Sequence, residues 1–271
     1  MVAWGLLRIL THLLWGLGNC ILLFPLIGEA RKKRRIVAWS RQLLAICRIQ
    51  VELVDAGGAQ QAAQLQGGEM VICNHLSWID IFVINTLAPC HFVAKADIRD
   101  WPLIGKLCEA AGTVFIARGN RRDVRRIFES MVERIHAGDR VAFFPEGTTA
   151  VQGQVLPFHA NLFEAAITAE VPLQPLALRY LNQHGQYEHA VDFVGETTFA
   201  QSVISILRAR GARAQLMILP LVSTEGAHRR ELAEQTRQMI VAGLGLQAAP
   251  AEPELATHSR AEKAEVSLPS Q

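Results

Sequence analysis

The chain has 271 residues, of which 50% are hydrophobic, and its formal net charge is +2. That is enough apolar sequence for one sizeable core, and the total charge does not indicate nucleic-acid binding. The odd number of cysteines and the lack of a C-x-x-C spacing argue against a disulfide framework and against zinc, and favour reduced, mostly buried thiols. These residues are Cys20, Cys47, Cys73, Cys90 and Cys108.

The first apolar segment covers residues 3–27 and carries a few polar interruptions, among them Arg8 and Asn19. A cleaved signal peptide is disfavoured, because no A-x-A site follows and a basic run lies on the wrong side. Two alternatives remain open. One is a single signal-anchor helix with the rest of the chain cytosolic. The other is a half-inserted helical hairpin whose second arm covers about residues 30–48. Both place the segment at the inner or plasma membrane.

The basic run is Arg31-Lys32-Lys33-Arg34-Arg35. Basic runs can indicate nucleic acid. Next to an apolar segment they favour anionic lipid, at about 1 kcal/mol per residue near the surface. We therefore expect an anionic membrane surface as a partner, and no nucleic acid.

Beyond residue 50, short apolar strands alternate with amphipathic helices. Strands are predicted at 50–54, 70–73, 91–94, 113–117, 141–144, 173–180, 189–194 and 214–219, with a loop over 56–69. Helices are predicted at 78–87, 103–110, 121–137, 162–169, 200–209 and 229–243. This alternation predicts an α/β fold with a mixed, mostly buried sheet flanked by helices.

The C-terminal residues 247–271 are rich in Ala, Pro, Glu and Ser and contain no aromatic residue. Such a segment cannot bury enough surface to fold alone, so a disordered tail is predicted. The expected organisation is a membrane-associated region at 1–49, one α/β domain at 50–245 and a tail at 246–271.

Two motifs follow predicted strands. Residues Asn74 to Asp80 give N-H-x-x-x-x-D, and about seventy residues later Phe144 to Thr148 read F-P-E-G-T. Taken alone, the first motif is weak evidence. Ser77 to Asp80 also fits an S-x-x-D capping pattern, and a carboxylate there would complement the positive end of a helix.

In this order and spacing, the two motifs together resemble the glycerolipid acyltransferase family, whose members include 1-acylglycerol-3-phosphate acyltransferases. Residues Gly112 to Arg118 resemble its second motif, G-x-x-F-I-x-R, and Val171 to Pro175 its fourth, V-P-x-x-P. The resemblance covers about residues 50–220.

The resemblance implies transfer of a fatty acyl chain from acyl-CoA or acyl carrier protein to the free hydroxyl of a lysophospholipid. The first candidate acceptor is 1-acylglycerol-3-phosphate, which would give phosphatidic acid. His75 would be the general base, as suits a side chain that titrates near neutrality. Asp80 would orient it and stabilise the imidazolium. No serine or cysteine nucleophile, metal or redox cofactor is required.

The resemblance also suggests how the acceptor is held. Arg118 would bind its phosphate, because a guanidinium fork holds two oxygens at once. Gly147 would let the backbone turn closely around the head group, with Thr148 beside it. Glu146, at the carboxyl end of a strand, would hold the acceptor hydroxyl or an arginine, unless it serves a structural ion pair. Lys95 is a weaker candidate for the same basic pocket.

The chain departs from the family pattern downstream of F-P-E-G-T. Many members continue with Arg-Ser, where this chain has Thr149 and Ala150, and the common F-K-x-G reads F-H-A-N from Phe158. F-P-E-G-T-T also occurs in proteins that resemble lyso-ornithine lipid acyltransferases. Two alternatives are therefore kept: a lyso-ornithine lipid O-acyltransferase, and a non-catalytic membrane lipid-binding module. The intact His75–Asp80 pair counts against the second.

Overall fold

The structure, a computed structural model, describes residues 2–58, 60, 67–101, 104–116 and 121–247. Within them a seven-stranded sheet has the order β1-β7-β6-β2-β5-β3-β4. The strands are β1 Ile49–Asp55, β2 Met70–Cys73, β3 His91–Lys95, β4 Val114–Ile116, β5 Val141–Phe143, β6 Leu173–Leu181 and β7 Ala212–Ile218. All neighbouring pairs are parallel except β6 and β7. The predicted α/β fold with a mixed sheet is confirmed.

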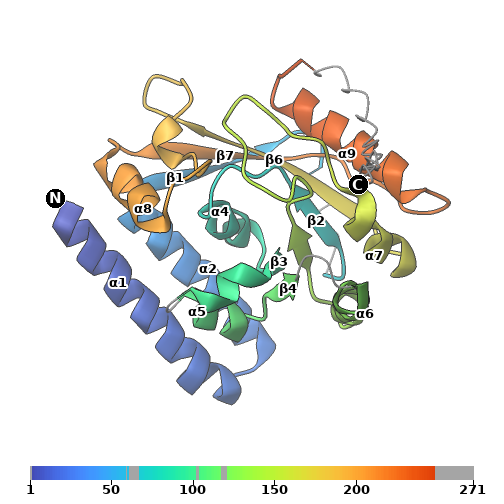
Figure 1. Ribbon diagram of the computed structural model, residues 1–271, viewed down its shortest axis with the longest axis horizontal. Coiled ribbons are helices and arrows are strands. Elements are labelled where there is room, and N and C mark those ends of the chain that lie inside the picture. Colours follow the sequence, from blue (N-terminus) through green and yellow to red (C-terminus); the bar gives the residue numbers. More distant parts are fainter. Residues whose placement is uncertain (1, 59, 61–66, 102–103, 117–120, 248–271) are drawn as a thin grey trace, which may run out of the picture.

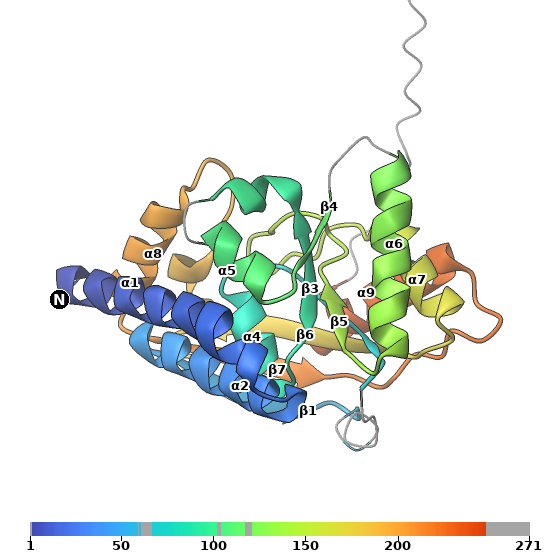
Figure 2. The ribbon, with the colours of Figure 1, turned by 90° about the horizontal axis from the view of Figure 1, so that it is seen from below.

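Helices cover both faces of this sheet (Figures 1 and 2). They are α1 Val2–Gly18, α2 Glu29–Ile46, α4 Asp80–Leu87, α5 Ile104–Ala110, α6 Arg121–His136, α7 Phe163–Thr168, α8 Phe199–Arg208 and α9 Arg229–Gly243. One buried cluster lies under α2, α4 and α8 and includes Leu43 and Ile84. The other lies under α6, α7 and α9 and includes Met131 and Ile240. The inner face of α2 is therefore part of the core.

The strand predicted at 189–194 is wrong. Residues His189–Val191 form a single 3₁₀ turn, and the carboxylate of Glu188 accepts the N–H of Ala190 there. Phe193 then donates its N–H to the carbonyl of Leu76. The segment cannot join the sheet beside β6, because β2 and β7 already occupy both edges of that strand.

The first two helices form an antiparallel hairpin (Figure 1). His12 and Trp39 join its arms: Nε2 of His12 lies 3.0 Å from the Trp39 carbonyl, and Nε1 of Trp39 donates to the His12 carbonyl at 3.1 Å. The helices thus have the hairpin shape of the second alternative, and its insertion into a membrane stays a prediction. The helical stretch Val2–Leu26 is long and apolar enough to cross a membrane. Trp4 and Trp15 are both 65% exposed on it.

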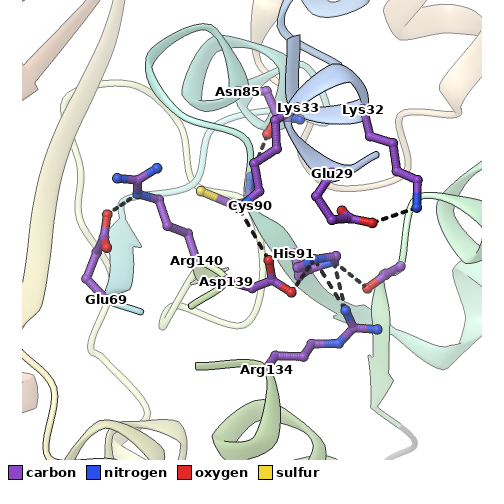
Figure 3. Close-up of polar contacts among 11 residues, drawn as sticks. Glu29, Lys32, Lys33, Glu69, Asn85, Cys90, His91, Arg134, Asp139 and Arg140 are labelled. Atoms are coloured by element: carbon purple, nitrogen blue, oxygen red, sulfur yellow. Dashed lines mark hydrogen bonds and ion pairs between the residues drawn. The ribbon is translucent and has the colours of Figure 1, made fainter. Parts of the chain in front are cut away.

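The basic run of α2 partly serves contacts within the protein. Lys32 pairs with Glu29 at 2.6 Å, and Arg35 donates to the side chain of Asn19 at 3.0 Å. Lys33 reaches Asp139, just before β5, at 3.5 Å. Figure 3 shows Lys33 pointing from the hairpin toward a polar cluster of the α/β domain. The run therefore helps to hold the hairpin on the domain.

Candidate active site

The two sequence motifs meet at one edge of the sheet. The His75 loop follows β2, and the F-P-E-G-T turn follows β5, which is the parallel neighbour of β2. Parallel neighbours end at the same edge, which is where sites collect in α/β sheets. The sheet thus brings together segments that are about seventy residues apart in the chain.

His75 and Asp80 form a close pair. Nδ1 of His75 lies 2.9 Å from Oδ2 of Asp80. The Asp80 side chain is fully buried, whereas that of His75 is 20% exposed. The same carboxylate oxygen accepts the backbone N–H groups of Leu76 at 2.7 Å and Ser77 at 2.9 Å. These charge-assisted bonds fix the carboxylate at the first turn of α4.

The capping pattern at Ser77 is only half formed. Asp80 accepts the Ser77 N–H, as the acidic partner of a capping box does. The Ser77 hydroxyl, however, is buried and has no hydrogen-bond partner in the described part of the chain. The helix begins at Asp80 rather than at the predicted residue 78. The serine half of the expected cap is wrong.

The ring of His75 is held from one side by an aromatic contact. It stacks on Phe144 with ring centroids 3.9 Å apart and an angle of 11° between the planes. Nδ1 is engaged by Asp80, and no described residue hydrogen-bonds Nε2. This leaves Nε2 as the ring atom that can accept a proton from a substrate.

Strand β6 also holds the loop that carries His75. The Asn74 side chain donates to the Leu178 carbonyl at 2.9 Å and accepts the Leu178 N–H at 2.8 Å. It thereby continues the β2–β6 ladder beyond the end of β2. Two residues further along β6, the Tyr180 hydroxyl donates to Oδ1 of Asp80 at 2.7 Å.

Tyr180 was missed by sequence reasoning, because it lies 100 residues from Asp80. A usable signal existed. Tyr180 is the one polar-tipped aromatic residue in the mostly aliphatic strand Leu173–Leu181, and a buried tyrosine hydroxyl nearly always needs a partner. The signal places the residue near the edge of the sheet but does not name its partner.

Glu146 lies beneath the His75 loop and is 3% exposed. Its Oε1 accepts the His75 N–H at 2.7 Å, and its Oε2 accepts the Leu156 N–H at 2.8 Å. Burial raises the pKa of Glu146 to about 7, against the opposing effect of these two amides. The structure thus joins Glu146 to two backbone segments. Its expected contact with the acceptor hydroxyl or an arginine stays a prediction.

The turn after Glu146 is as tight as expected. Gly147 has a φ of +66°, and a Cβ there would lie 3.0 Å from Cδ2 of His159. The positive backbone angle therefore favours glycine, and a side chain there would also press on the His159 ring. Thr148 is exposed beside it, and the Thr149 hydroxyl donates to the carbonyl of Phe193.

Lys95 and Arg118 are the remaining predicted site residues. Lys95 is exposed at the carboxyl end of β3, the same edge of the sheet as His75. Arg118 lies outside the described residues. Cys73 is buried directly before Asn74, and burial, with the charges of Asp80 and Glu146, raises the pKa of its thiol well above the usual value. This fits the predicted packing role and not a thiolate nucleophile.

The fold is the one expected of the glycerolipid acyltransferases that the motifs resemble. Comparison with known proteins agrees. The Acyltransferase family model matches residues 54–179. A lyso-ornithine lipid O-acyltransferase of Pseudomonas aeruginosa is 36% identical over 179 residues, covering 66% of this chain and 69% of the relative. The chain belongs to the acyltransferase family.

Other relatives differ in their named acceptor. A 1-acyl-sn-glycerol-3-phosphate acyltransferase of Neisseria gonorrhoeae is 37% identical over 155 residues, covering 57% of this chain and 59% of the relative. The crystal structure of the 1-acyl-sn-glycerophosphate acyltransferase of Thermotoga maritima superposes with a TM-score of 0.68 over 90% of this chain and 93% of that one. At 19% sequence identity, that likeness shows the fold.

Proposed function

We propose that the protein transfers a fatty acyl chain from a thioester to the free hydroxyl of a lysolipid, with His75 as general base. One observation carries the proposal. The buried Asp80 holds Nδ1 of His75 at 2.9 Å, while Nε2 of this 20% exposed side chain has no hydrogen-bond partner among the described residues, at the edge of the sheet that both motifs share. A histidine held in this way is ready to accept a proton.

The reaction balances with these residues alone. Nε2 of His75 takes the hydroxyl proton as the acceptor oxygen attacks the carbonyl carbon of the thioester. Asp80 stabilises the imidazolium that forms. The carbon–sulfur bond breaks, and the leaving thiolate takes the proton back from His75. The donor is an acyl-CoA or an acyl carrier protein, and no metal or redox cofactor takes part.

The first candidate acceptor is 1-acylglycerol-3-phosphate, with Arg118 as the phosphate ligand, and lyso-ornithine lipid is the second. The observation that favours the second is at Thr149. Its hydroxyl is tied to the backbone of Phe193, so this position offers the acceptor neither an arginine nor a free hydroxyl. Relatives with either acceptor in their names support both candidates.

An acceptor panel tests the proposal. The full chain in detergent is incubated with acyl-CoA or acyl carrier protein and a set of lysolipids, with His75→Ala as the inactive control. We expect turnover with at least one lysolipid and its loss in the variant. Binding of lysolipids without any turnover would instead support the non-catalytic lipid-binding module.

Arg118→Ala separates the acceptors further. We expect it to raise KM for a phosphate-bearing acceptor more than KM for the thioester. Equal effects on both would indicate a structural arginine. No effect would favour an acceptor without a phosphate monoester.

We also propose that the helical hairpin places the site at the cytosolic face of the membrane. The exposed apolar residues of the stretch Val2–Leu26 support this, among them Trp4, Leu14, Trp15 and Leu22.

Because Leu43 of α2 is part of the core, removing residues 1–49 would damage the domain. Substitution of Trp4, Trp15 and Leu22 by glutamine in the full chain is the cleaner test. Flotation with anionic liposomes should then decrease, even in high salt, while the fold is kept.

A further inference from the structure

Tyr180 occupies the side of Asp80 that the His75 loop leaves open. Oδ2 of Asp80 accepts from His75 and from two backbone amides, and Oδ1 accepts the Tyr180 hydroxyl at 2.7 Å. The geometry points to Tyr180 as a positioning residue of acyl transfer, which fixes the Asp80 carboxylate and through it the ring of His75. This inference rests on the proposed function.

The position of the hydroxyl is built from several segments. The backbone N–H of Tyr180 donates to Oε1 of Gln152 at 2.6 Å, and Nε2 of Gln152 donates to the Glu188 carbonyl at 3.1 Å. Two residues earlier, Leu178 exchanges two hydrogen bonds with Asn74. Asn74 and Asp80 are therefore clamped by the same strand, on either side of His75. Side chains locked in this way hold a site in its productive geometry.

Tyr180 acts as a donor and not as an acid. Its side chain is fully buried. Burial raises the pKa of Tyr180 well above its usual value, and the Asp80 carboxylate raises it further. The phenol therefore keeps its proton, and no proton moves between the two side chains. The hydrogen bond spreads part of the Asp80 charge onto Tyr180, away from the oxygen that faces His75.

Loss of this hydrogen bond would stabilise the charged form of His75. More negative charge would remain on Oδ2, and the protonated ring of His75 would become more stable. The neutral base would then form only at higher pH. Among the described residues, the other titratable groups near Asp80 or Tyr180 are Glu146 after β5, Cys73 on β2 and Cys47 after α2, and Arg237 of α9 acts on Glu146. None of these side chains hydrogen-bonds the Tyr180 hydroxyl, which donates to Asp80.

Tyr180→Phe in the full chain tests the inference. We expect kcat to fall about tenfold, as for loss of a hydrogen bond to a charged group. Because Tyr180 is buried away from solvent, KM for both substrates should stay within about twofold. The acid limb of the pH–rate profile should move up by about half a pH unit.

Two matched variants separate position from stability. Tyr187→Phe removes the hydroxyl of the only other tyrosine in the chain. Thr236→Val removes a fully buried hydroxyl that donates to the Leu232 carbonyl within α9, on the opposite face of the sheet. Both should keep the wild-type kcat per folded molecule and the wild-type acid limb, and Thr236→Val reports the cost of a lost buried hydroxyl.

A proton NMR measurement gives a readout without turnover. The resonance of the Nδ1 proton of His75 in the free protein should shift in Tyr180→Phe and not in Thr236→Val. The inference is overturned if that resonance does not move, or if Tyr180→Phe lowers kcat without moving the acid limb. Failure of the wild-type chain to acylate any lysolipid would instead refute the proposed function, while the NMR result still decides the position of His75.

Discussion

Among the described residues, two His–Asp pairs with side chains no more than 26% exposed lie at opposite edges of one sheet, and only one of them leaves a ring nitrogen without a hydrogen-bond partner. His75 and Asp80 lie at the carboxyl ends of β2 and β5. His91 and Asp139 lie at the amino ends of β3 and β5, where Nε2 of His91 is 3.3 Å from Oδ2 of Asp139. The residue types are the same, so the difference must come from what surrounds each pair.

The second pair belongs to the polar cluster of Figure 3. Nδ1 of His91 lies 3.2 Å from the Gly112 carbonyl and 3.2 Å from Nη1 of Arg134, so both ring nitrogens are engaged. Burial lowers the pKa of His91, and the neighbouring Arg134 lowers it further. Lys33 also forms an ion pair with the Asp139 carboxylate. The arrangement ties the hairpin to the domain and leaves no ring nitrogen for a substrate.

The largest expected effect is the loss of the base. His75→Ala should lower kcat at least about a hundredfold, as expected for removal of a general base. His91→Ala should leave kcat within about threefold, although it should lower the melting temperature. Acyl transfer per folded molecule, with melting curves for both variants, makes the comparison. If His75→Ala kept more than about a tenth of the activity, the proposed mechanism would be wrong.

The next effect concerns the carboxylates. Asp80→Asn should lower kcat about a hundredfold, because an amide cannot stabilise the imidazolium. The NH₂ group of the new asparagine would also face hydrogen-bond donors, since Asp80 accepts four hydrogen bonds. Asp139→Asn should change kcat little. Similar losses in both variants would contradict the distinction between the two pairs.

The sequence predicted the elements of the site better than their arrangement. The strands around His75 and Glu146 were predicted because short apolar runs end in polar motifs. The strand predicted at 189–194 was wrong, because its Val191 is buried in the core cluster under α2, α4 and α8 without joining the sheet. The local sequence pattern cannot distinguish a residue buried in the sheet from one buried outside it.

What the sequence could not give is pairing across long distances. Nothing in the composition of β6 indicates that Leu178 would hold Asn74 or that Tyr180 would reach Asp80. Those contacts depend on β6 lying beside β2, which is fixed only when the whole sheet forms. For the same reason Lys33, predicted as a lipid ligand, could not be recognised as a partner of Asp139.

A pH-dependent effect is expected at Glu146. Its pKa is raised from 4.5 to about 7, so the folded state holds this proton more tightly than the unfolded state does. The stability that comes from the protonated group is full below about pH 4.5 and is lost as pH rises through 7, by about 3 kcal/mol. Because glutamine does not titrate, Glu146→Gln should gain stability relative to the wild type over that range.

Denaturant unfolding of both proteins between pH 4.5 and 8 checks this prediction. The difference in their free energies of unfolding isolates Glu146 from other titrating groups. At low pH the variant should be the less stable one, because its NH₂ group cannot accept the N–H of His75 or Leu156. A difference that is constant with pH would show that Glu146 titrates alike in both states.

The smallest effect is expected at the opposite edge, where Lys33 joins the hairpin to the domain. Its partner Asp139 is 3.5 Å away, and the two side chains are 40% and 25% exposed, so the pair should contribute at most about 1 kcal/mol. Lys33→Ala should therefore lower the free energy of unfolding slightly, and the loss should shrink in high salt. Lys32→Ala is the matched control, because Lys32 pairs within α2, with Glu29. Both variants should keep the wild-type kcat, since neither residue lies at the edge that carries His75. A loss of kcat in Lys33→Ala alone would show that the seating of the hairpin is transmitted to the active site, and the two edges of the sheet would then have to be treated as coupled.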